Sequence, residues 1–127
     1  MKNILYTIIL SFIFSSGVFA DWTYMTSHDG VDAYLDFDAV ERNNGLIYIW
    51  GLLDYKTKDP WDNLSSSALH ELDCNNTPKR KRVISTRGYS GNMGAGELNI
   101  SSSTHGDWEY PRPGSLYTFL TKKLCSP

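Results

Sequence analysis

Two cysteines, Cys74 and Cys125, constrain the fold of this chain more than any other residues. Two cysteines in an exported chain are most simply a disulfide, and two allow only one pairing. The closed loop has about 50 residues between the partners, for which the chain-entropy estimate is about 4 kcal/mol of stability. A redox-active pair would need a close Cys-x-x-Cys spacing, which the sequence lacks. We therefore expect the end of the chain to be tied back onto its middle.

The N-terminal segment indicates export. Met1–Asn3 is short and positively charged, Ile4–Phe14 is almost wholly apolar, and small residues lead to a cleavage site after Ala20. A membrane-spanning helix needs roughly 20 apolar residues, and this run is about half that length. The sequence therefore predicts a signal peptide over residues 1–20, one domain over residues 21–127 and no transmembrane segment. No cysteine follows the apolar run, so no lipid anchor is expected there. The predicted location is the periplasm, the outer-membrane surface or the medium.

Alternating apolar residues and β-branched residues predict about six strands. We expect strands over Asp21–Ser27, Val31–Asp36, Leu46–Tyr55, Leu69–Cys74, Lys79–Tyr89 and Glu97–Ile100. Asp29-Gly30 is typical of a tight hairpin between the first two. Leu46–Tyr55 is the most hydrophobic stretch after the leader, which favours a central strand. A short helical turn is expected over Ala39–Arg42, capped by Asp36 or Asp38.

The C-terminal segment predicts a short helix. Ser115 is a suitable N-cap, and apolar residues follow it at helical spacing. These are Leu116, Phe119, Leu120 and Leu124. Cys125 lies at the end of this apolar face, so a bond to Cys74 would dock the helix. The predicted fold class is α+β, a single antiparallel β-sheet with one C-terminal α-helix tied to the sheet by a disulfide.

A basic run is the best candidate for a binding surface. The strands Leu69–Cys74 and Lys79–Tyr89 are expected to be joined by a basic turn, whose charged residues are Lys79, Arg80, Lys81 and Arg82, with Arg87 close behind. Such a cluster can bind sulfated glycans, acidic protein segments or anionic lipid headgroups. The alternative is a solvated hairpin end whose charges keep a sheet edge from pairing with neighbours.

The overall charge does not indicate a nucleic-acid binder. The chain has 12 basic and 14 acidic residues, and the predicted cleavage would remove one of the basic ones, Lys2. The four tryptophans are compatible with a groove in which sugars or bases stack on aromatic rings. The alternative is that most aromatic residues pack in the core and between strands.

Catalytic, metal and cofactor sites are not expected. His28, His70 and His105 lie in three segments without ligand spacing, and both cysteines are expected to be oxidised. His70 neighbours Glu71, but adjacent strand residues point to opposite faces. Gly91–Gly96 is rich in glycine, yet a strand and not a helix is expected after it, so a phosphate loop is not indicated.

The chain resembles the surface-adhesin protein E family of Gram-negative bacteria. The segments that carry the resemblance are Trp22, Tyr34–Asp36, Ile49-Trp50, Leu53–Lys56, Glu71–Cys74, Tyr89–Glu97, Trp108–Tyr110, Pro113–Ser115 and Leu124-Cys125. No single motif is very specific, but the ordered set with both cysteines spans nearly all of residues 22–125.

The resemblance implies an antiparallel sheet with a helix held by the disulfide, and a non-enzymatic protein of the outer envelope. The adhesins that give the family its name bind host matrix proteins such as vitronectin and laminin, and they can dimerise. Those adhesins are usually regarded as lipid-anchored, and this chain departs from them in lacking a cysteine after the leader. The family has no catalytic residues that carry over to this sequence.

Two hypotheses of function follow. The first is an exported envelope protein that binds a protein or an anionic glycan through residues 79–82 and the flanking strands. The alternative is a periplasmic accessory or inhibitor module that recognises an endogenous envelope protein. A hydrolase ranks last because no nucleophile and base are paired in the sequence.

Overall fold

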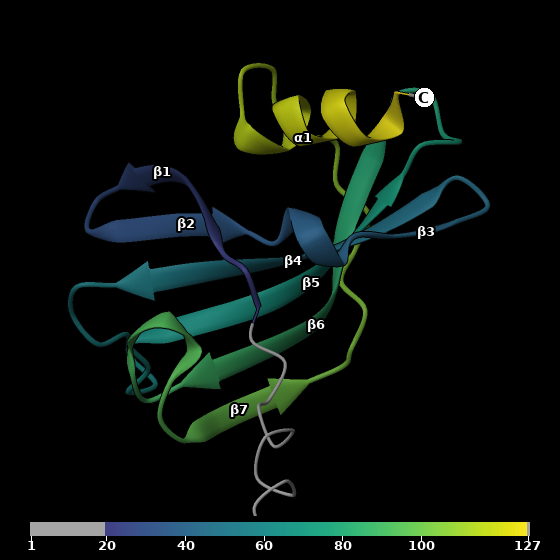
Figure 1. The fold of residues 1–127 in the computed structure, drawn as a ribbon. Coiled ribbons are helices and arrows are strands. Elements are labelled where there is room, and N and C mark those ends of the chain that lie inside the picture. The colour runs from purple at the N-terminus through teal and green to yellow at the C-terminus, as the bar shows by residue number, and fades with distance from the viewer. Residues whose placement is uncertain (1–19, 127) are drawn as a thin grey trace, which may run out of the picture.

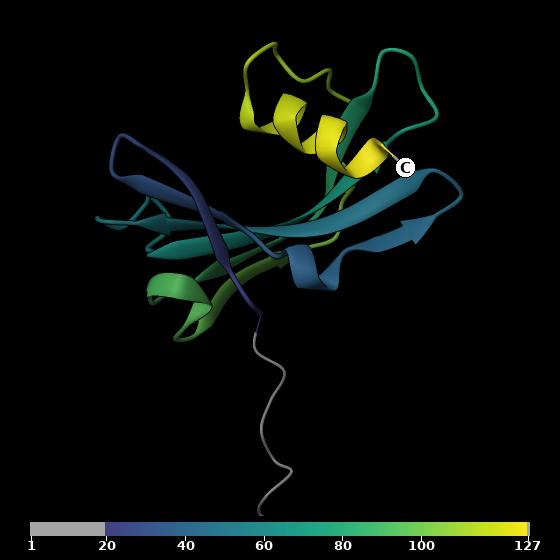
Figure 2. The same ribbon diagram turned by 45° about the horizontal axis from the view of Figure 1, so that its top comes forward.

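The computed structural model describes residues 20–126. The predicted signal peptide lies outside the described residues except for Ala20. The described chain forms one antiparallel sheet and a C-terminal α-helix, as Figures 1 and 2 show. The predicted fold class is confirmed.

Seven strands make up the sheet. They are β1 (Thr23–His28), β2 (Val31–Leu35), β3 (Glu41–Asn43), β4 (Leu46–Tyr55), β5 (Ser65–Asp73), β6 (Arg80–Tyr89) and β7 (Leu98–Ser102). The spatial order is β1-β2-β4-β5-β6-β7, and β3 pairs with β4 beside this path. The prediction that Leu46–Tyr55 is a central strand is confirmed, because it pairs with β2, β3 and β5.

Two hairpin turns follow directly from the sequence. Asp29 and Gly30 both have positive φ, 50° and 78°, between β1 and β2. Asn44 and Gly45 repeat this pattern, 52° and 81°, between β3 and β4. Asparagine, aspartate and glycine tolerate this conformation, and it matches the twist of the flanking strands.

Three predicted boundaries are wrong. The helical turn lies at Phe37–Ala39 (η3), where Asp36 accepts a hydrogen bond from the Asp38 amide, and Glu41–Asn43 is a strand instead. β5 begins at Ser65, four residues before the start of the predicted strand Leu69–Cys74. The basic turn expected over residues 79–82 is limited to Lys79, because Arg80, Lys81 and Arg82 belong to β6.

The helix α1 (Leu116–Cys125) begins at the predicted cap, where the Ser115 side chain accepts a hydrogen bond from the Thr118 amide. It packs across one face of the sheet (Figure 2), which we call the helix face. Its buried Leu120 and Leu124 join four sheet residues in the core, Leu35, Ile47, Ile49 and Leu72. Phe119 was expected on this apolar face but is 49% exposed.

The disulfide between Cys74 and Cys125 is confirmed, with the two Cα atoms 5.4 Å apart. It joins the end of β5 to the last turn of α1. Nη1 of Arg42 donates a hydrogen bond of 2.6 Å to the Leu124 carbonyl, which adds a second tie between the sheet and the end of the helix. Such a disulfide is typical of an oxidising compartment outside the cytoplasm.

Within residues 20–126, no helix combines the length and apolar character needed to span a membrane.

Candidate functional site

The basic run is divided between the two faces of the sheet. Side chains alternate along a strand, so neighbouring residues of β6 point in opposite directions. Lys81 lies on the helix face, where it contacts Tyr117 of α1. Arg80 and Arg82 lie on the opposite side, which we call the outer face. The expected single cluster is therefore not formed.

Two arginines of the outer face are paired with buried carboxylates. Arg80 donates from Nε to Asp73 at 2.9 Å, and Arg82 donates from Nε to Glu71 at 2.7 Å. Each pair lies directly across β5 and β6, and both carboxylate residues are buried. Buried carboxylates need such partners because an unpaired charge in the interior is costly.

Titration of the neighbouring groups reflects this pairing. Burial alone would raise the pKa of Asp73, but hydrogen bonds from Arg80 and from backbone amides outweigh it and lower this pKa. The Tyr48 hydroxyl donates to Glu71 at 2.7 Å, and this hydrogen bond, with burial, raises the pKa of Tyr48. The lowered pKa means that Asp73 is held in its charged form.

Trp108 lies against both paired arginines. The guanidinium carbons of Arg80 and Arg82 are each 4.3 Å from a Trp108 ring centroid, which is cation–π distance. The chain places Trp108 there because Lys81 and Glu109 exchange two backbone hydrogen bonds of 2.8 and 2.7 Å. Residues far apart in the sequence thus make one surface.

Arg87 joins the same face through a β-bulge. His70 pairs with Val83 and Leu69 pairs with Ser85, so β6 holds one extra residue, Ile84, between them. The extra residue shifts the alternation by one. The outer face consequently holds Arg87 as well as Arg80 and Arg82, although an odd number of positions separates Arg87 from them.

The charge of Arg87 is not neutralised within residues 20–126. Its guanidinium carbon lies 4.9 Å from the Trp50 ring centroid, and no described carboxylate lies within 4 Å. The residue is exposed. Lys79, just before β6, donates from Nζ to the Cys74 carbonyl at 2.6 Å. Of the five predicted residues, Arg87 is therefore the one with an uncompensated charge on the outer face.

A hollow of about 400 Å³ adjoins Arg87, and we call it the Arg87 groove. It is lined by Trp22, Asp36, Trp50, Leu52, Ser67, Arg87, Tyr89, Met93 and Gly94, and also by Ala20, which is the last residue of the predicted signal peptide. Three aromatic side chains, Trp22, Trp50 and Tyr89, and one guanidinium thus border the groove. A groove of this kind matches the aromatic stacking alternative considered for the tryptophans.

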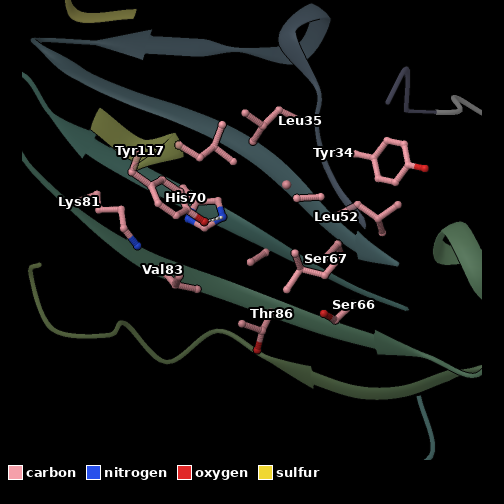
Figure 3. Close-up of a pocket in the computed structure, with 15 residues that line it drawn as sticks. Tyr34, Leu35, Leu52, Ser66, Ser67, His70, Lys81, Val83, Thr86 and Tyr117 are labelled. Atoms are coloured by element: carbon pink, nitrogen blue, oxygen red, sulfur yellow. Dashed lines mark hydrogen bonds between the residues drawn. The ribbon is translucent and has the colours of Figure 1, made fainter. Parts of the chain in front are cut away.

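A second hollow, of about 330 Å³, lies on the helix face beside α1 (Figure 3). Its residues come from β2, β4, β5, β6 and α1 and include Ala33, Leu53, Ala68, Val83 and Leu116. In Figure 3 the rings of His70 and Tyr117 lie against each other, with Lys81 beside them. The hollow is apolar apart from this end and a few hydroxyls.

His70 is held neutral at that end. Burial lowers its pKa to about 4, with a further contribution from the positive charge of Lys81 and a smaller opposing one from Glu109. Its Nε2 lies 3.4 Å from the Tyr117 hydroxyl, and Nδ1 has no hydrogen-bond partner among the described residues. Gly51 leaves room for the ring, since a Cβ there would lie 3.2 Å from Nε2.

These groups do not form a catalytic constellation. In the described part of the chain, His70 bonds to Tyr117 and to no serine, threonine or cysteine. Glu71 lies on the other face from His70, as the alternation predicted. The Lys81 ammonium forms a salt bridge of 3.0 Å with the Glu109 carboxylate. No cluster of three or more His, Cys, Asp or Glu side chains in residues 20–126 is placed to hold a metal ion.

The sequence did not predict that Trp108 and Trp50 contact the arginines of the outer face. The alternation of Arg80, Lys81 and Arg82 along a strand was sufficient to predict their division between two faces. Trp108 is distant in sequence, and its position depends on a bridge that no local pattern indicates.

Comparison with known proteins supplies one further observation. The model of a family described as surface-adhesin protein E matches residues 22–126. No curated protein and no solved structure gives a match.

Proposed function

This chain belongs to the surface-adhesin protein E family, and on that premise we propose that it is an exported, non-enzymatic envelope protein that binds another macromolecule. Family membership suggests a surface adhesin. The disulfide and the predicted signal peptide support export. Host matrix proteins such as vitronectin and laminin are the partners proposed, because the resemblance implies them.

The outer face of the sheet is the binding surface in this proposal. The single observation that supports it is a row of cation–π contacts on this face, in which Arg80 and Arg82 lie against Trp108 and Arg87 lies against Trp50. Arginine and tryptophan are enriched where proteins bind one another, since both combine a large contact area with directed interactions. No α-helix covers this face in residues 20–126.

The row also explains how a basic surface coexists with buried carboxylates. Asp73 and Glu71 fix the Nε side of two guanidinium groups, while each guanidinium still stacks on Trp108. Fixed side chains lose little conformational entropy when a partner binds. The surface is therefore pre-organised.

The test compares one variant of each face. The outer-face variant replaces both members of two pairs, Arg80→Gln with Asp73→Asn and Arg82→Gln with Glu71→Gln, so that no buried carboxylate loses its partner. The helix-face control replaces Lys81→Gln with Glu109→Gln. Circular dichroism establishes that both variants fold before binding is measured.

We expect the protein to bind immobilised vitronectin or laminin in surface plasmon resonance. Binding should weaken at least tenfold from 0.15 to 0.5 M salt, because exposed charges are screened. The outer-face variant should lose binding and the control should keep it. Equal binding by both variants would reject the surface assignment, and no binding to any matrix protein would reject the adhesive role.

A further inference from the structure

We propose that the Arg87 groove binds one acidic sugar residue, a ring that carries a carboxylate or a sulfate. This inference rests on the proposed function, because it names the chemical class that the outer face recognises. It assigns contact with this ring to Arg87 and its aromatic neighbours, while Arg80 and Arg82, which do not line the groove, remain part of the wider protein-binding surface.

The charge argument starts from the difference between the arginines. Arg80 and Arg82 are each within 3 Å of a buried carboxylate, so their charges are compensated inside the protein. Arg87 is exposed and, among residues 20–126, has only the Trp50 ring as a close partner for its charge. A guanidinium can donate two parallel hydrogen bonds to a carboxylate or a sulfate. It therefore favours planar or multi-oxygen anions of this kind over anions that offer a single charged atom.

The shape argument comes from the aromatic lining. Trp22, Trp50 and Tyr89 border the groove, whose volume is about 400 Å³. The faces of aromatic rings are electron-rich and attract the weakly positive C–H groups on one side of a sugar ring. A pocket with apolar walls and a few placed polar groups is the usual form of a small-ligand site.

Polar atoms in the same groove suit the hydroxyls of a sugar. Asp36 and Ser67 both line it and are only 4% and 6% exposed. The Asp36 carboxylate accepts one hydrogen bond, from the Asp38 amide at 3.2 Å, and keeps further acceptor capacity. We therefore place a hydroxyl of the sugar against the Asp36 carboxylate, which would repel an anion, and the acidic group of the ring against Arg87.

An acidic peptide segment is the competing occupant, and the groove fits it less well. The carboxylate of an aspartate or glutamate can pair with the guanidinium, but these short side chains have no ring to stack on the aromatic residues of the groove. A single acidic ring uses both the charge and the aromatic walls.

The experiment is calorimetric titration of the purified protein with a heparin-derived tetrasaccharide. Maltotetraose is the neutral sugar of equal length, and a glutamate-rich peptide is the acidic control without sugar rings. The variants are Arg87→Gln and Trp50→Leu. The matched control is Arg112→Gln, which removes the same charge from an exposed residue in the segment before α1. Thermal unfolding establishes that each variant is folded.

We expect the tetrasaccharide to bind with quenching of tryptophan fluorescence. Arg87→Gln should weaken binding at least tenfold and Trp50→Leu at least fivefold, while Arg112→Gln leaves it unchanged. Arg87→Lys, which keeps the charge without the planar fork, should give an intermediate affinity. Maltotetraose should not bind measurably.

Three results would overturn the inference. They are unchanged affinity in Arg87→Gln, equal binding of the neutral sugar, and tighter binding of the acidic peptide than of the tetrasaccharide. Failure here is distinct from failure of the proposed function: a protein that binds laminin on its outer face but ignores every saccharide would keep the function and lose this inference.

Discussion

His70 is a titratable ring buried on the helix face, where it is 6% exposed. Its pKa of about 4 in the folded protein lies below the value of about 6.5 in an unfolded chain. The unfolded chain therefore takes up a proton first as the pH falls. Stability from this site is fully present above pH 6.5 and is lost progressively between about 6.5 and 4.

We predict that this loss reaches about 3 kcal/mol, because each pKa unit corresponds to about 1.4 kcal/mol. The variant His70→Leu removes the titrating group and should flatten this part of the pH dependence. Urea unfolding followed by tryptophan fluorescence at pH 7, 6, 5 and 4.5 measures the difference. Lys81 and Glu109, which face the ring, remain in both proteins. Parallel pH profiles for the two proteins would contradict the prediction.

At this scale the sequence identified residue types but not their partners. The five basic residues were visible at once, and so was the separation of His70 from Glu71 by strand alternation. The pairing of Lys81 with Glu109 was not visible, because 28 residues separate them and only the fold brings them to 3.0 Å. Compensated and uncompensated arginines look identical in sequence, so Arg87 could not be distinguished from Arg82.

At the scale of elements, the bulge in β6 determines which face each arginine occupies. Ile84 is surplus to the pairing of β5 with β6, since Val83 and Ser85 already face consecutive residues. Deleting Ile84 should leave a regular strand in which Val83 and Arg87 keep their faces. Deleting Ala68 instead removes a residue from β5, which has no surplus, and should send part of that strand to the wrong face.

We predict that the Ile84 deletion folds, with a loss of about 1–2 kcal/mol from the buried apolar area of that side chain. It should also retain tetrasaccharide binding, whereas the Ala68 deletion should unfold or lose it. Chemical denaturation and calorimetric titration check both outcomes. Equal damage from the two deletions would show that the bulge is required for folding and would refute the prediction.

Elements were predictable where local chemistry determines them. The Ser115 cap and the Asp29-Gly30 hairpin turn are fixed by residues in direct sequence neighbourhood, and both are confirmed. β3 was mistaken for a helical turn because three exposed residues, Glu41–Asn43, have no apolar alternation to indicate a strand. This strand forms because its backbone pairs with β4, which follows the Asn44-Gly45 turn, and its own side chains give no signal for it.

For the whole molecule, the decisive feature is that the two faces of one sheet carry different groups of side chains. The helix face holds the core under α1, and the outer face holds the arginines and tryptophans. The disulfide and the Arg42 hydrogen bond act only on the helix side. The strand pairing of the described sheet, by contrast, involves no residue of α1.

We predict that the double variant Cys74→Ser with Cys125→Ser loses at most about 4 kcal/mol of stability, the chain-entropy estimate for the loop that the bond closes. Hydrogen exchange should increase first at residues 116–125, because α1 is held by side-chain packing and by its last turn, while β4 and β5 stay protected. Tetrasaccharide binding at the Arg87 groove should remain within twofold of the wild type, since that groove lies on the opposite face. Loss of binding together with helix protection would mean that α1 supports both faces, and the division of the molecule into two independent faces would be wrong.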